Sequence, residues 1–144
     1  MRRHDSLIPL SHDHHHALVQ VRRLKLAAKA GEESRMETAQ AFLDFFREDT
    51  LDHFREEEEK VFPLVVDSPD LRGTLGRVMF EHLRIHKLVL GLQEDVNSGA
   101  VSSDQRIRLA TALERHIRFE EKVVFPEIER VAAEALNHAV LTTT

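Results

Sequence analysis

The sequence predicts an all-α protein, an up-down-up-down four-helix bundle with a short fifth helix at its C-terminal end. Three observations indicate this fold. Apolar residues recur at spacings of three and four along four long stretches, turn-forming residues separate those stretches, and no stretch alternates with a period of two. Short connections favour antiparallel neighbours. The length of 144 residues leads us to expect a single domain over residues 1–144.

The first two helices are bounded by capping and turn residues. Ser11 is the candidate N-cap of the first helix, and Gly31 closes it. Ser34 is the candidate N-cap of the second helix, which we expect to run to about Val66. The inward stripe of the first helix has five members: Ala17, Leu18, Val21, Leu24 and Ala28.

The remaining helices follow two further turns. Pro69 suits the first position of the third helix, which ends near residues 97–99. Ser102 or Ser103 opens the fourth helix. Pro126 is expected to end or kink that helix, because proline cannot donate a backbone hydrogen bond. Residues 127–138 then form the short fifth helix.

Composition excludes several classes of function. A formal net charge of −5 gives no electrostatic footprint for nucleic acid. The chain has no cysteine, so thiolate catalysis, disulfides and thiolate metal sites are excluded. No apolar run approaches the length of a membrane span, and the start of the chain lacks the apolar stretch of a signal peptide. We therefore expect a cytoplasmic protein without a membrane partner. Histidine, with ten residues, is the one excess.

An eleven-residue motif occurs twice, as HFREEEEKVFP at 53–63 and HIRFEEKVVFP at 116–126. In each copy a glutamate follows the histidine by four residues, giving His53/Glu57 and His116/Glu120. Residues four apart share one face of a helix. Each copy therefore presents an imidazole and a carboxylate together, as half of a metal-binding wall. The neighbouring Glu56, Glu58, Glu59 and Glu121 are interpreted as a solvent-facing surface. For Glu58 and Glu121, which match across the repeat, the alternative is a supporting role behind the metal ligands.

The third helix adds two histidines at the same depth. His82 and His86 lie four residues apart in EHLRIH, residues 81–86. His53 lies 15 residues before Ser68 in the second turn and His82 lies 14 after it, so their depths in an antiparallel pair match. His116 lies as far beyond the third turn as His82 and His86 lie before it. Any one histidine alone is better explained as a core residue, but the shared depth favours metal ligands.

The first helix offers the run His12-Asp13-His14-His15-His16, of which one side chain can face the site. His14 shares the inward stripe, whereas His15 would share a face with Arg22. Asp13-His14 also matches Glu81-His82 at an offset of 68 residues. We favour His14 as the ligand, with His15 as the alternative.

The complete set is too large for a four-coordinate structural zinc. Five imidazoles and two carboxylates suit two six-coordinate transition ions with bridging carboxylates, and mixed nitrogen and oxygen ligands favour iron or manganese. The predicted ligands are His14, His53, Glu57, His82, His86, His116 and Glu120.

These motifs, together with DHHHALVQV at 13–21, resemble the hemerythrin-like family, also called the HHE cation-binding domain. The resemblance covers the whole bundle and implies two non-haem irons, with zinc or manganese less favoured. It assigns His53 and the first-helix histidine to one iron, the histidines at 82, 86 and 116 to the other, and both glutamates to the bridge. Glu120 departs from the oxygen-carrying hemerythrins, which have an aspartate five residues after the last histidine.

The resemblance implies binding or sensing of O2, or of a related ligand such as NO or peroxide, at an open iron position. Two alternatives belong to other classes: a di-iron redox enzyme that consumes peroxide or NO, and an iron reservoir or donor. The chain has no tyrosine or tryptophan, which disfavours radical chemistry. Whether the protein is an enzyme, and which electron donor it uses, is left open by the sequence.

Overall fold

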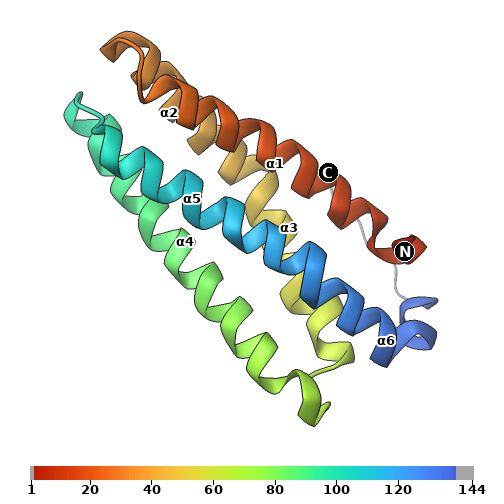
Figure 1. The fold of residues 1–144 in the computed structure, drawn as a ribbon. Coiled ribbons are helices and arrows are strands. Elements are labelled where there is room, and N and C mark those ends of the chain that lie inside the picture. The colour runs from red at the N-terminus through yellow and green to blue at the C-terminus, as the bar shows by residue number, and fades with distance from the viewer. Residues whose placement is uncertain (1, 139–144) are drawn as a thin grey trace.

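The computed structural model describes residues 2–138, and in this part of the chain four long helical segments lie side by side (Figure 1). The α1 segment packs against α2 and α5, and α4 also packs against α2 and α5. The predicted all-α bundle is confirmed. The helices are α1 (Ile8–Ala27), α2 (Glu32–Phe45), α3 (Leu51–Glu56), α4 (Arg72–Ser98), α5 (Ser103–Phe119) and α6 (Phe125–Leu136).

Short helical turns connect or extend these helices. Turns of π-helix join α2 to α3, follow α3, and join α5 to α6, so two segments of the bundle are composite. The π-helical turns are η2 (Phe46–Thr50), η3 (Glu57–Val61) and η6 (Glu120–Val124). The 3-10 turns are η1 (Asp5–Leu7), η4 (Phe62–Leu64) and η5 (Pro69–Leu71).

The capping predictions are partly confirmed. Ser102 caps α5, and its hydroxyl accepts a hydrogen bond from the backbone N–H of Gln105. Gly99 ends α4 in the left-handed conformation at a φ of 82°, which glycine adopts without a Cβ penalty. The predictions for Ser11 and Ser34 are wrong. Helix α1 begins earlier, at Ile8, with a proline in its first turn, and α2 begins after Gly31.

Two of the π-helical turns occupy equivalent positions in the repeated motif. The N–H of Phe62 donates to the carbonyl of Glu57, and the N–H of Phe125 donates to that of Glu120, each five residues back. A proline follows each turn. Because a proline ring clashes with the carbonyl four residues before it, a local change to five-residue hydrogen bonding lets the helix continue. The fourth segment therefore does not end at Pro126 but continues through η6 into α6.

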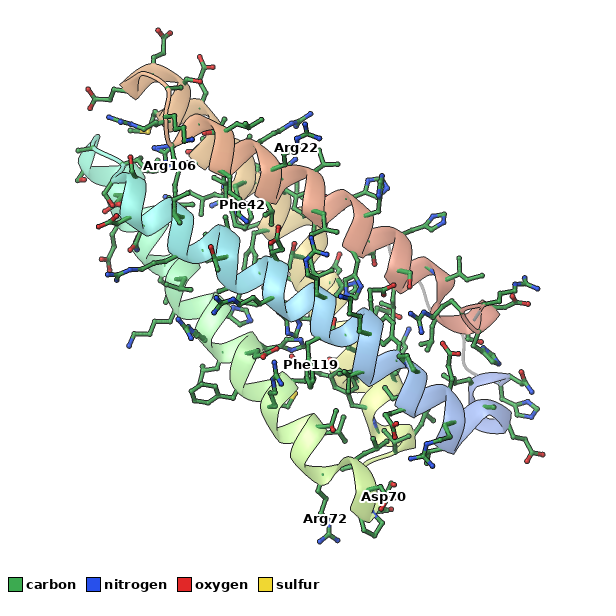
Figure 2. The ribbon with its side chains drawn as sticks, in the orientation of Figure 1. Arg22, Phe42, Asp70, Arg72, Arg106 and Phe119 are labelled. Atoms are coloured by element: carbon green, nitrogen blue, oxygen red, sulfur yellow. The ribbon has the colours of Figure 1, made fainter. Side chains whose placement is uncertain are left out.

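Two apolar layers enclose the middle of the bundle. One layer includes Phe54 and Ile117 and extends toward the connection between α1 and α2. Figure 2 shows Phe42 between the helices in that half of the bundle. The other layer includes Val61 and Val124 and lies toward the chain termini. Glu57 and Glu120 come between these layers in both repeats. No helix among residues 2–138 is both long enough and apolar enough to span a membrane.

Candidate metal centre

Six of the seven predicted ligands converge in the middle of the bundle. They form two groups that share both glutamates, and within each group one ligand atom per residue lies within 4.8 Å of the others. All six side chains are buried. The first group is His14, His53, Glu57 and Glu120, and the second is Glu57, His82, His116 and Glu120.

The glutamates at the centre face histidines of both groups. Glu57 places Oε2 at 3.3 Å from Nε2 of His53 and Oε1 at 3.2 Å from Nε2 of His82. Glu120 places Oε1 at 2.8 Å from Nε2 of His14 and at 3.4 Å from Nε2 of His116. A carboxylate whose two oxygens face different groups is arranged to bridge two ions.

A second ring of carboxylates surrounds the first. Each of the four buried histidines donates its Nδ1–H to a carboxylate from a neighbouring helical segment, which leaves Nε2 facing the centre. Such partners fix the tautomer and ring orientation of metal-binding histidines. The pairs are His14 with Glu121 at 2.8 Å, His53 with Asp13 at 3.1 Å, His82 with Glu58 at 2.6 Å and His116 with Glu81 at 2.7 Å.

The ring closes around the whole bundle. The α1 histidine is oriented from η6, the α5 histidine from α4, the α4 histidine from η3 and the α3 histidine from α1. Every helical segment thus gives one histidine to the centre and one carboxylate to its neighbour. The two halves of the chain follow the same scheme, so the site has approximate two-fold symmetry.

The interpretation of Glu58 and Glu121 as part of a solvent-facing surface is therefore wrong, because both carboxylates bind site histidines. Their match across the repeat is the sequence signal for the alternative role, which the structure favours. The match of Asp13-His14 with Glu81-His82 likewise pointed to the remaining pair.

Carboxylates control the protonation of this cluster. Burial alone would lower the pKa of His53, but the charge of Glu57 and the hydrogen bond with Asp13 raise that pKa well above its ordinary value. Burial would likewise lower the pKa of His14, yet hydrogen bonds with Glu120 and Glu121 raise it. Burial would raise the pKa of Glu120, but the charge of His116 and the hydrogen bond from His14 hold it well below its usual range.

Several buried polar atoms at the centre have no hydrogen-bond partner: Nε2 of His53, His82 and His116, both oxygens of Glu57, and Oε2 of Glu120. Leaving buried donors, acceptors and charges unsatisfied costs several kcal/mol each. Cations between these atoms would satisfy them all. Nitrogen and oxygen donors on two groups with shared carboxylates fit transition ions.

The other histidines lie outside both groups. His86 is half-buried, and its ring meets the edges of Phe46 and Phe54 at centroid distances of 5.5 Å and 5.7 Å. Burial and the nearby His82 lower its pKa. Its role as a seventh ligand stays a prediction. In the first-helix run, His14 is the residue in the site, whereas His15 and His16 are exposed.

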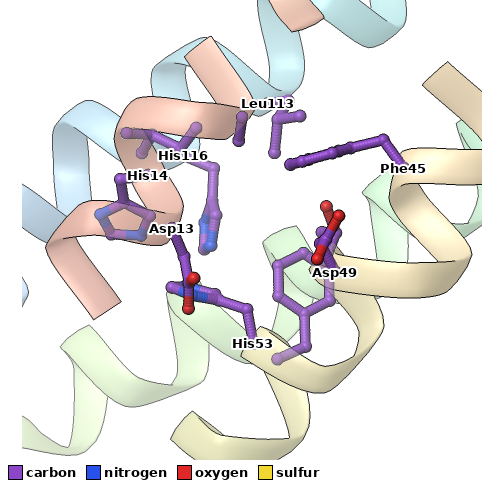
Figure 3. Close-up of a pocket in the computed structure, with 11 residues that line it drawn as sticks. Asp13, His14, Phe45, Asp49, His53, Leu113 and His116 are labelled. Carbon is purple, nitrogen blue, oxygen red and sulfur yellow. The ribbon is translucent and has the colours of Figure 1, made fainter. Parts of the chain in front are cut away.

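A small cavity lies beside the first group. It offers ≈ 20 Å³ to the centre of a water-sized molecule, which is about the room that one water needs. Figure 3 shows the histidines at 14, 53 and 116 on one side of it and Phe45 and Asp49 on the other. Thr50 also lines the cavity, and its buried hydroxyl has no hydrogen-bond partner.

In the second group, aromatic rings cover His82. Phe54 stacks on the imidazole of His82 at a centroid distance of 3.9 Å and an interplanar angle of 13°. Phe62 approaches the same imidazole at 6.2 Å. His82 does not line the cavity. Both histidines of the first group line the cavity, whereas only His116 of the second group does.

A four-helix bundle that directs histidines and carboxylates from facing helices into its core is the architecture of bundle metalloproteins. The model of the hemerythrin HHE cation-binding domain matches residues 6–135. The chain belongs to this family, whose members bind metal ions, typically iron. No curated protein and no solved structure matches the chain.

Proposed function

We propose that the chain binds two non-haem irons, one in each group, bridged by Glu57 and Glu120. The main support for this proposal is that both groups contain these two carboxylates. One oxygen of Glu57 faces a histidine of the first group, and the other faces a histidine of the second group. Glu57 and Glu120, together with the outer ring of four carboxylates that accept from the histidine Nδ1–H groups, make six carboxylates. Multivalent cations would balance their negative charge. Mixed nitrogen and oxygen ligands favour iron over a structural zinc.

We further propose that the iron of the first group binds O2 or a related small ligand, such as NO or peroxide, from the cavity. When bound, two ferrous ions supply electrons to such a ligand. The protein supplies a small pocket bounded by Phe45 and Leu113 and a hydroxyl donor on Thr50. The four Nδ1 contacts keep the imidazoles fixed during ligand exchange.

The test is addition of O2 to the anaerobically reduced, iron-loaded protein, followed by visible absorption. We expect an O2-dependent change, and binding of azide by the oxidised protein. No change in the fully loaded reduced protein would reject ligand binding. Many turnovers of added peroxide per site would instead assign a redox enzyme.

Thr50 provides a sharper test of where the ligand binds. Thr50→Val keeps the shape of the side chain and removes the donor. We expect the affinity for NO to fall by about 2- to 10-fold, the value of one hydrogen bond, with iron content unchanged. Thr111→Val, on α5 away from this cavity, is the control. An unchanged affinity in Thr50→Val would place the ligand elsewhere.

Storage and release of iron is a second candidate function with one observation in its favour. An outer cavity of ≈ 170 Å³ is lined by Asp13, His16, Phe45 and Asp49, and it shares three of these residues with the inner cavity. Carboxylates along such a route favour the passage of cations. Rapid transfer of iron to a chelator, without O2-dependent absorption changes, would favour this function.

A further inference from the structure

Helix α4 carries an apolar stripe that no part of the described chain covers. Phe80 and Leu83 are each 67% exposed, and Leu90 is 64% exposed. Their spacings of three and seven put them on one face of the helix. His82, on the same helix, is buried at the metal centre. The exposed apolar stripe therefore lies on a different face of α4. Exposed apolar patches of this kind mark interaction sites.

The stripe lines a groove between α4 and α5, which we call the α4/α5 groove. Its volume is ≈ 850 Å³, and it extends along α4 from Phe80 to Glu94. At 1.5 Å per residue this is about 21 Å, the length of a four-turn helix. The side chain of Gln105 from α5 lies over Gly91, at the place where a Cβ would be. A Cβ at residue 91 would meet only the flexible end of this side chain, which could move aside.

The groove has an unbalanced positive charge. Arg84, Lys87 and Arg108 line it, and within residues 2–138 none of the three forms an ion pair. Glu94 is the one carboxylate among its lining residues. This surface is basic on a chain whose formal net charge is −5. A partner with acidic side chains beside an apolar stripe would complement both features.

We propose that the α4/α5 groove binds an acidic amphipathic helix of a partner protein. Leucine-type side chains of that helix would contact Phe80, Leu83 and Leu90, and its flanking glutamates or aspartates would pair with the cations. Helix-in-groove recognition uses apolar anchors at spacings of three, four and seven. The proposal depends on neither the metal nor the small ligand.

A second copy of the chain fits the groove less well. In a two-fold antiparallel contact between α4 helices, the apolar side chains meet best when Phe80 lies opposite Leu90 of the copy. The axis then passes at the level of Ile85. Arg84 and Lys87 of both copies would gather around it, and four like charges oppose the contact. A lipid surface would leave the recess between α4 and α5 unfilled.

The test uses three synthetic peptides and measures binding by fluorescence anisotropy. The first is an 18-residue acidic helix with leucines at helical spacing, about four to five turns. The second has the same composition in scrambled order, and the third has lysine in place of glutamate. We expect binding of the first peptide, weakened by salt, and much weaker binding of the other two.

Paired variants of the protein separate the apolar and charged contributions. We expect Leu83→Ser with Leu90→Ser, and Arg84→Glu with Arg108→Glu, each to weaken binding by about tenfold or more. Leu26→Ser, at an α1 residue that is 65% exposed, is the matched control and should bind normally. Because all these side chains are exposed on helices, circular dichroism should show unchanged folding.

Three results would overturn the proposal. Equal binding of the acidic and scrambled peptides would mean that the helical spacing of the leucines does not contribute to recognition. Binding to phosphatidylglycerol vesicles without binding to the acidic peptide would identify a lipid surface instead. Dimerisation of the wild-type chain in sedimentation equilibrium that Leu83→Ser with Leu90→Ser abolishes would assign the groove to a second copy.

Discussion

Glu58 accepts a hydrogen bond at 2.6 Å from Nδ1 of His82, and the two residues come from different helical segments, η3 and α4. The carboxylate fixes which nitrogen of the imidazole faces the centre. The same relationship holds for all four buried histidines. Each histidine is thus positioned by a neighbouring helix rather than by its own, which connects the geometry of the site to the packing of the bundle.

Because Glu58 holds the imidazole of His82 in place, we expect Glu58→Gln to weaken metal binding, although Glu58 is in neither ligand group. Loss of such a carboxylate partner typically costs about 10- to 100-fold in metal affinity. Competition with a chelator measures the change. Glu59→Gln is the control, since Glu59 is exposed and lies near Arg55 at 3.7 Å. Equal affinities of the two variants would mean that the carboxylate does not position the imidazole.

The sequence predicts His86 as a metal ligand, but His86 is not among the six ligands that the structure brings together. In the structure each group has four members without it, and its predicted role as the seventh ligand means that His86→Ala should lose one ion. His82→Ala, which removes a member of the second group, should lose metal. Elemental analysis of both variants is the measurement. Two ions retained by His86→Ala would reject the seven-ligand set.

Protonation of the cluster predicts how the stability of the metal-free protein depends on pH. The pKa values of His14, His53 and His82 are raised in the folded protein. Their stabilisation is therefore fully present below the unfolded value of about 6.5 and is lost as the pH rises through the folded values. Glu120, whose pKa is lowered, acts oppositely and loses its stabilisation as the pH falls below its ordinary range.

We therefore expect the melting temperature of the metal-free protein to fall from about pH 6.5 toward pH 8.5. Iron should reverse this trend, because metal binding displaces the protons. Thermal unfolding followed by circular dichroism, with chelator and with iron, measures both. His12→Gln, at an exposed position, should leave the slope unchanged. A metal-free melting temperature that rises over this interval would contradict the assigned protonation.

The central ligands could be predicted because helix periodicity fixes them. His53 with Glu57 and His116 with Glu120 are i,i+4 pairs in a repeated motif, so each pair shares a face whatever the surroundings. The prediction of a bundle then brought the two faces together. The start of α5 could also be predicted, because the side chain of Ser102 caps that helix.

The sequence favoured a solvent-facing position for Glu58 and Glu121 over a place in the outer ring, for a geometric reason. Glu58 lies about 100° around the helix from the inward Glu57, on a flank that borders either solvent or another helix. The sequence does not tell which helix lies on that side. His86 lies one turn, about 5.4 Å, beyond His82 and beside Phe46 and Phe54, so its place in the ligand set stays a prediction. The π-helical turns η3 and η6 precede Pro63 and Pro126, and the sequence does not tell how a helix continues past a proline.

Glu57 and Glu120 belong to both groups, and we propose that these groups hold two irons. The most direct measurement is the iron content per chain after anaerobic loading with ferrous iron and desalting. We expect about two irons per chain, the number that bundle sites with shared carboxylates hold. A content of one iron per chain, or a single tightly held zinc that iron does not replace, would contradict the account.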